Sequence, residues 1–291
     1  MCVFCRTIAA GTLALVASTG VAGAADMAYP EPPVVAHEPA FANPAAGWYI
    51  RGDVGLGITE NDGWELGSLT AANGRFLTDD IGDAPIIGAG VGYRVNEFVR
   101  LEITGEYRGS IGISATDQYR HTCTFVGGSC TSVGGVINRN NMWEGQLDST
   151  VVMVGGLVDV GEFAGITPFV GGSVGAAYNR IHGLRDSDPS DLGGGGIAKD
   201  KGTWNFAWAL QTGLAYDVSD RLTLEAGYRF MSLGDAESGA VSCLPTSAGC
   251  GFEGVKVKDL YSHDLRLGMR WALDAPAPAA EPDFGPIMRK F

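Results

Sequence analysis

The segment from residue 204 to residue 217 reads WNFAWALQTGLAYD and decides the fold class. Its even-numbered residues, from Trp204 to Tyr216, are almost all large and apolar, whereas its odd-numbered residues are small or polar. Such alternation is the period of a β-strand with two unlike faces. Strands in soluble sheets usually have about five or six residues, but a tilted strand needs about nine to eleven to cross a bilayer. Because a strand edge cannot stay unpaired in lipid, the pattern predicts a closed barrel.

Seven further segments extend this pattern to an all-β fold, an eight-stranded antiparallel transmembrane β-barrel. The predicted strands cover 47–58, 86–95, 98–108, 147–160, 167–178, 204–217, 222–231 and 260–273. Short turns alternate with the long connections 59–85, 109–146, 179–203 and 232–259. Bacterial barrels have short periplasmic turns and long extracellular loops, so both barrel ends are predicted to lie in the periplasm. The registers of 147–160 and 167–178 stay open, because their two faces are too alike.

The chain is predicted to have four parts. Residues 1–25 form a secretory signal peptide, because Arg6 and an apolar stretch precede the small-x-small cleavage site Ala22-Gly23-Ala24. Residues 26–46 form a Pro/Ala-rich periplasmic leader. Residues 47–273 form the barrel, and 274–291 form a C-terminal tail.

The formal net charge of −13 argues against nucleic acid as a partner. Acidic side chains are concentrated between the first two predicted strands. They are Glu60, Asp62, Glu65, Asp79, Asp80 and Asp83. Solvated loops are the simpler interpretation, and divalent cations that bridge these carboxylates to lipopolysaccharide phosphates are the alternative.

Four cysteines follow the predicted signal peptide, in two equally spaced pairs, Cys123 with Cys130 and Cys243 with Cys250. Each pair lies within one long connection. An exported protein enters an oxidising compartment, so the pairs predict two local disulfides. Zinc is the less suitable alternative, because its ligands are usually spaced more closely and include histidine.

Charged residues occupy the faces opposite the apolar ones, and an eight-stranded barrel is only wide enough for side chains to fill it. The sequence therefore predicts a network of ion pairs inside a closed lumen. A narrow or gated ion path is the alternative. The predicted lumen residues are Arg51, Asp53, Arg94, Arg100, Glu102, Glu106, Arg108, Asp217, Glu225, Arg229, Asp264, Arg266 and Arg270.

Aromatic residues are predicted to form a girdle at each membrane interface. Those assigned to the periplasmic rim are Trp48, Tyr93, Phe98, Phe163, Phe169, Tyr216 and Trp271. Those assigned to the outer rim are Tyr107, Tyr178, Trp204, Phe206, Trp208, Tyr228, Phe230 and Tyr261.

The histidines suggest one catalytic alternative. Some small barrels modify lipid A with a histidine, a serine and a carboxylate, and here His263 lies between Ser262 and Asp264. Neighbours in a strand point to opposite faces, so these three residues cannot form a triad by themselves. We therefore expect no catalytic residue, no metal and no cofactor.

Several segments resemble the alphaproteobacterial outer-membrane β-barrel family, the OmpA/OmpX-like small barrels that include surface antigens and porin-like proteins. They are GWYIRGD at 47–53, RLEITGEYR at 100–108, TPFVGG at 167–172, SHDLRLGMR at 262–270 and PIMRKF at 286–291. The resemblance implies a non-enzymatic protein of the bacterial outer membrane with a structural or surface-interaction role. Its expected partners are lipid and lipopolysaccharide, the barrel-assembly machinery and an extracellular partner of the loops. A porin-like channel is the first alternative and a lipid A-modifying enzyme the second.

Overall fold

The computed structural model describes residues 46–67, 74–126, 129–187, 195–244 and 251–273. The predicted signal peptide, nearly all of the leader and the C-terminal tail lie outside these residues, as does Cys250. No helix in the described ranges is long and apolar enough to cross a membrane.

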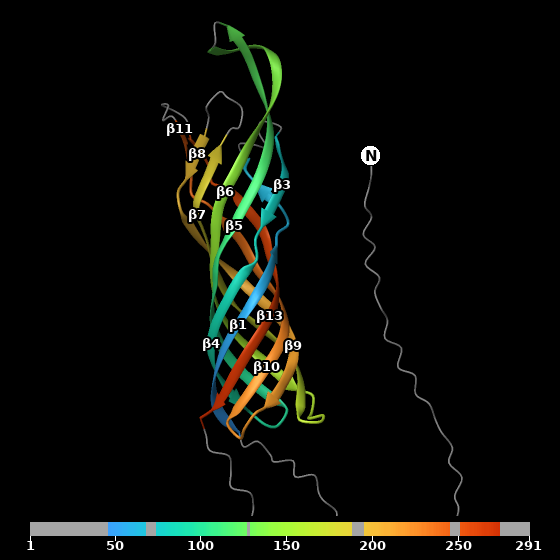
Figure 1. Ribbon diagram of the computed structural model, residues 1–291. Coiled ribbons are helices and arrows are strands. Elements are labelled where there is room, and N and C mark those ends of the chain that lie inside the picture. The colour runs from blue at the N-terminus through green and yellow to red at the C-terminus, as the bar shows by residue number, and fades with distance from the viewer. Residues whose placement is uncertain (1–45, 68–73, 127–128, 188–194, 245–250, 274–291) are drawn as a thin grey trace, which may run out of the picture. The chain divides into compact units, whose positions relative to one another are not determined.

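Thirteen strands form one antiparallel sheet in the described part of the chain (Figure 1). Eight of them close a ring in the order β7-β6-β5-β4-β1-β13-β10-β9, because β9 also pairs with β7. The ring strands are β1 (Gly47–Glu60), β4 (Ala84–Arg94), β5 (Val99–Val126), β6 (Ser129–Asp159), β7 (Ile166–Ser187), β9 (Lys201–Asp217), β10 (Leu222–Glu237) and β13 (Lys256–Ala272). The others are β2 (Trp64–Glu65), β3 (Arg75–Ile81), β8 (Gly195–Ala198), β11 (Val241–Leu244) and β12 (Gly251–Phe252). The eight predicted strands all lie in this ring.

The predicted long connections contain more strand than the sequence analysis assigns to them. β5 continues to Val126 and β6 begins at Ser129, so most of 109–146 is one long hairpin. It projects beyond the other strands, at the end of the ring opposite the short turns (Figure 1). β3 borders the hairpin only as far as Gln118, and β7 borders it only from Met142 onward. We call the part of the hairpin between residues 119 and 141 the arm.

A bulge explains why the alternation of apolar and polar residues in 98–108 does not continue past Arg108. β5 carries one extra residue between Arg108 and Ile111, and this reverses which residues face inward. Before the bulge Leu101 and Ile103 face outward, and after it Ile111 and Ile113 face inward. The apolar residues thus change from the outer to the inner face of the ring, and the period of two is interrupted.

The structure also fixes the two registers that the sequence left open. On β6, Val151 and Met153 are buried, whereas Val152 is 50% and Val154 is 55% exposed. On β7, Val170 and Val174 point outward in the same way. Phe169 is buried, which corrects its assignment to the periplasmic rim: it faces the interior, where the Arg100 guanidinium lies 5.2 Å from its ring centre.

An apolar belt surrounds the outside of the ring near the short-turn end. Its exposed members include Trp48, Ile50, Val54, Leu56, Ile58, Leu101, Ile103, Val152, Val154, Val170, Val174, Leu210, Leu214, Leu265, Leu267 and Met269. From Trp48 to Ile58 ten steps of about 3.3 Å, at a tilt of about 40°, span about 25 Å. Aromatic pairs lie near both edges of the belt, with Trp48 against Tyr93 at 5.1 Å and Tyr178 against Trp204 at 5.0 Å.

A second irregularity, on β10, is stabilised by buried amides. Gly234 has φ +72°, and a Cβ there would meet Asn205, so the position requires glycine. Asn179 donates to the carbonyls of Leu233 and Asp235 at 2.9 Å each. These two hydrogen bonds replace the regular strand hydrogen bonds that the irregularity interrupts.

Candidate functional site

Twelve charged side chains meet inside the ring and form what we call the ionic cluster. Its members are Arg51, Arg100, Arg108, Arg229, Arg266, Arg270, Asp53, Glu102, Glu106, Asp159, Glu225 and Asp264. The side chains are at most 9% exposed. Six cations face six anions, so the cluster has no net formal charge. This balance is what burial demands, because an unpaired buried charge is costly.

Glu225 is the hub of the part nearer the short turns. It lies within ion-pair distance of Arg100 Nη1 at 3.0 Å, Arg51 Nη2 at 3.2 Å and Arg270 Nε at 2.9 Å. Glu102 accepts hydrogen bonds from the Tyr49 hydroxyl at 2.7 Å and from Arg51. This half of the cluster joins residues from β1, β5, β10 and β13.

Asp264 is the hub of the other half. Its Oδ1 accepts from Arg108 Nη2 and from the Ser262 hydroxyl, both at 2.6 Å, and its Oδ2 accepts from Arg229 Nη2 at 2.6 Å. Arg229 also donates to Glu106 at 2.7 Å. The Asp264 carboxylate therefore touches two guanidinium groups on different strands.

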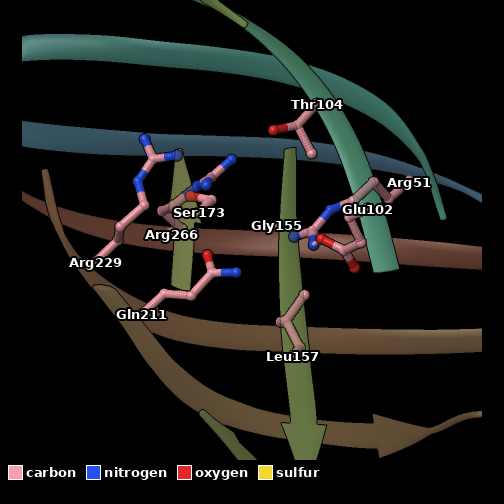
Figure 2. Close-up of a pocket in the computed structure, with 9 residues that line it drawn as sticks. All are labelled: Arg51, Glu102, Thr104, Gly155, Leu157, Ser173, Gln211, Arg229 and Arg266. Carbon is pink, nitrogen blue, oxygen red and sulfur yellow. Dashed lines mark hydrogen bonds and ion pairs between the residues drawn. The ribbon is translucent and has the colours of Figure 1, made fainter. Parts of the chain in front are cut away.

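Arg266 lies between the two halves and is the least satisfied member. Its Nη2 is 3.4 Å from Asp53 and 3.6 Å from Glu106, and neither contact is a hydrogen bond. Its Nε also lacks a partner among the described residues. A cavity of about 10 Å³ lies beside it, and Figure 2 shows Arg229 on the same side of this cavity, with Arg51 opposite. A second cavity of about 20 Å³ adjoins the same arginines. Each holds about one water molecule.

The cluster contains most of the predicted lumen residues. Arg94 is one exception, because within the described ranges it makes none of the ion pairs and lies at the short-turn rim, where β4 ends. Asp217 also stays outside and accepts a hydrogen bond from Thr223 at 2.5 Å. Asp159 was missed. It pairs with Arg100 at 2.9 Å, and the inward register of β6 would have identified it.

Toward the projecting end, the interior changes from ionic to apolar. Buried residues there include Ile111, Ile113, Leu147, Val151, Met153, Ile181, Met231, Leu233 and Leu260. We call this set, with Trp143 and its other buried neighbours, the apolar core. It begins directly after the cluster on β10 and β13: Met231 follows Arg229, and Leu260 precedes Ser262. A hydrated ion that entered the ring would have to cross this layer.

One carboxylate is buried within the apolar core, beyond the belt. Asp117 accepts a hydrogen bond from Trp143 Nε1 at 2.8 Å and from the backbone N–H of Asn141 at 3.3 Å. Burial raises the pKa of the Asp117 carboxyl, although these hydrogen bonds oppose the shift.

The histidines do not assemble a catalytic relay in the described part of the chain. Ser262 and Asp264 are buried inside the ring, whereas His263 faces outward and contacts the Tyr228 hydroxyl at 2.7 Å. A second set, Ser110, Asp148 and His182, meets on the outer face, which the sequence did not indicate. Both oxygens lie 3.1 Å from the same His182 Nε2. A relay needs one partner on each ring nitrogen.

The described residues do not test the two predicted disulfides. Cys123 and Cys130 lie in β5 and β6, and Cys243 lies in β11. Because Cys250 and the side chains of the first pair are not described, both disulfides stay predictions. Across the described ranges, no group of three or more His, Cys, Asp or Glu side chains is placed to hold a metal ion.

The chain resembles known proteins over most of its length. No protein-family model matches it. An uncharacterized protein of Brucella abortus is 28% identical over 88% of this chain and 94% of its own. A Rickettsia bellii protein named "Putative adhesin" is 24% identical over 77% of this chain and 87% of its own.

Two solved structures are similar to the chain at low sequence identity. Neisserial surface protein A has a TM-score of 0.40 and 14% identity, over 77% of this chain and 96% of its own. The outer membrane protein OprG of Pseudomonas aeruginosa has a TM-score of 0.45 and 11% identity, over 78% of this chain and 96% of its own.

Proposed function

We propose that the chain is an integral β-barrel protein of the bacterial outer membrane with a structural and surface-interaction role. The observation that carries this proposal is the inverted distribution of side chains, with an apolar belt outside and the ionic cluster inside the closed ring. A soluble protein rarely exposes a contiguous apolar surface of this size. In lipid the belt is solvated by acyl chains, and ring closure leaves no strand edge unpaired at the level of the belt.

The arm is the part that we assign to surface contact. Both of its strands continue past the described parts of their neighbours, so no described strand pairs with their outer edges between residues 120 and 140, and a strand edge without a neighbour offers backbone N–H and C=O groups. Such edges can pair with an extended segment of another protein. The Rickettsia relatives that carry the adhesin name support this assignment.

Epitope tags test the location and the orientation together. A tag inserted at 127–128 should be labelled by antibody on intact cells. The same tag in the turn 95–98 should be labelled only after the outer membrane is permeabilised. Labelling of the turn but not the arm on intact cells would overturn the proposed orientation, and absence of both from the outer-membrane fraction would overturn the location.

The interaction role needs its own test. Cells that produce the chain with residues 121–137 replaced by a short turn should attach to host cells less than cells that produce the full chain. Equal surface amounts of both forms, measured with a tag elsewhere in the long connections, provide the control. Equal attachment of the two forms would contradict the role of the arm.

A diffusion channel is the second candidate, and the lumen charges favour it. The apolar core opposes it, since ions would have to lose their hydration to pass. Refolded protein in a planar bilayer should therefore show no steady openings, and ohmic single-channel steps would favour the channel instead. For the lipid A enzyme, mass spectrometry should show identical lipid A with and without the protein.

A further inference from the structure

We propose that the cavity beside Arg266 binds one small monovalent anion, with chloride as the probe ligand. The first step is the unsatisfied guanidinium. Arg266 is only 9% exposed, yet its Nε and Nη2 lack hydrogen-bond partners among the described residues. The nearest carboxylates, those of Asp53 and Glu106, lie 3.4 and 3.6 Å from Nη2 without a hydrogen bond. A buried N–H group without a hydrogen bond is costly, so a ligand that accepts from both nitrogens would lower the free energy of the folded state.

The second step is the charge of the lining. Three guanidinium groups, from Arg51, Arg229 and Arg266, border the cavity, against one carboxylate from Glu102. That carboxylate is already engaged by Tyr49 and Arg51, and the Arg229 guanidinium by Glu106 and Asp264, so Arg266 supplies the donors that are left for a ligand. In Figure 2 Arg229 and Arg266 approach the cavity from the same side, and Glu106, which is not drawn there, lies within ion-pair distance of both guanidinium groups.

The third step concerns the neutral groups and the size. Besides Gly155 and Leu157, the uncharged residues of the lining are Thr104, Ser173 and Gln211, and each of these three has a side-chain N–H or O–H that can donate to an anion. At about 10 Å³ the cavity holds one particle about as large as a water molecule. Chloride and bromide are of this order of size, whereas sulfate and gluconate are too large.

A water molecule is the competing occupant. Oε2 of Glu106 and Oε2 of Glu225 also lack hydrogen-bond partners, and water could donate to them. Neither residue lines the cavity beside Arg266, whereas Glu225 lines the adjoining cavity of about 20 Å³. The structure therefore assigns the anion to the first cavity and leaves the second to water.

Bromide identifies the occupant directly. Crystals of the full chain grown in sodium bromide should show an anomalous peak within hydrogen-bond distance of Arg266 Nε or Nη2. A cavity without such a peak, filled by water or empty, would overturn the proposal.

Unfolding in solution provides a second measurement on the same protein. If the folded state alone binds the anion, the unfolding equilibrium constant in urea should fall by the factor 1 + [Cl⁻]/Kd as chloride replaces gluconate at constant ionic strength. Arg266→Met should remove this dependence, and Gln211→Leu should weaken it if the first variant does not fold. The matched control is Arg180→Met, since Arg180 lies on the outer face with its side chain 48% exposed, and it should keep the full dependence. Equal unfolding in both salts would contradict the site.

Discussion

Asp264 shows at the scale of one residue how this fold tolerates buried charge. Its carboxylate is fully buried and touches two guanidinium groups and a hydroxyl. Replacement of one member of a buried pair leaves its partners uncompensated, which costs far more than the net value of the pair.

Asp264→Asn should therefore destabilise the folded protein by about 3–5 kcal/mol. Urea unfolding of the refolded protein in detergent or vesicles measures this loss. Lys201→Gln is the control, because Lys201 pairs with Glu237 at 2.5 Å on the surface, and exposed pairs contribute about 0–1 kcal/mol. Similar small losses for both variants would show that the cluster is no stronger than a surface pair.

Gly92 is a second residue with a specific role. A Cβ at this position would fall on the ring of Tyr49, which is buried and donates to Glu102. Gly92→Ala should destabilise the protein by about 1–3 kcal/mol, because the ring must move and its hydrogen bond is lost. Gly105→Ala on β5 is the matched control, since nothing lies within 4 Å of its Cβ position, and it should be close to neutral. The reverse order of the two effects in urea unfolding would exclude this packing.

The residue identities allowed most of the ionic cluster to be predicted, because alternation alone assigns a side chain to one face. The prediction failed where alternation alone does not determine the position of a side chain. Arg94 has the correct parity but lies at the rim, and Asp159 was missed because β6 is apolar on both faces. Phe169 was assigned to the rim, although its inward face follows from the register with β6 and β9.

At the scale of elements, the bulge on β5 is the feature that the sequence analysis could not detect. Periodicity assumes a constant parity, and one extra residue between Arg108 and Ile111 reverses it. The segment 109–146 is therefore predicted as a connection, although Ile111, Ile113 and Trp143 in it face inward and are as apolar as the residues of a core strand. Its length as a hairpin became visible only from the pairing of β5 with β6.

Asp117 makes the stability of this hairpin depend on pH. Because its pKa is raised by burial, the folded state binds the proton more tightly than the unfolded chain does. Its contribution to stability is therefore greatest at low pH and declines as the pH rises from the ordinary Asp range through the raised pKa. The Trp143 indole N–H resonance should titrate with a midpoint above that of an ordinary aspartate, and Asp117→Asn should remove this titration. A midpoint at or below the ordinary value would contradict the effect of burial.

The arm and its predicted disulfide should be dispensable for the ring. The arm lies beyond the parts of β5 and β6 that pair with β3 and β7, and Cys243 lies in β11, outside the ring. Reduction of both predicted disulfides should therefore leave the heat-modifiable migration of the folded protein on gels unchanged. Cys123→Ser with Cys130→Ser should behave in the same way. Loss of the folded band in either experiment would show that the arm contributes to closure of the ring.

At the scale of the whole molecule, the interior has two layers and the exterior one belt. The ionic cluster lies near the short turns, and the apolar core follows it toward the projecting end. The sequence predicted the first layer because charges opposite apolar residues can be recognised locally. It could not predict the second, because these apolar residues come from segments assigned to loops and meet only in the closed ring.

The most direct test of the central claim is the environment of consecutive residues on β13. Single cysteines at 262, 265, 267 and 268 would be spin-labelled in vesicles, and the collision rates with oxygen and with a water-soluble nickel complex would be compared. Positions 265 and 267 should favour oxygen strongly, as lipid-facing sites do, whereas 262 and 268 should be reached poorly by both reagents. Ready access of the nickel complex to positions 265 and 267 would contradict a lipid-facing belt, and with it the proposed membrane barrel.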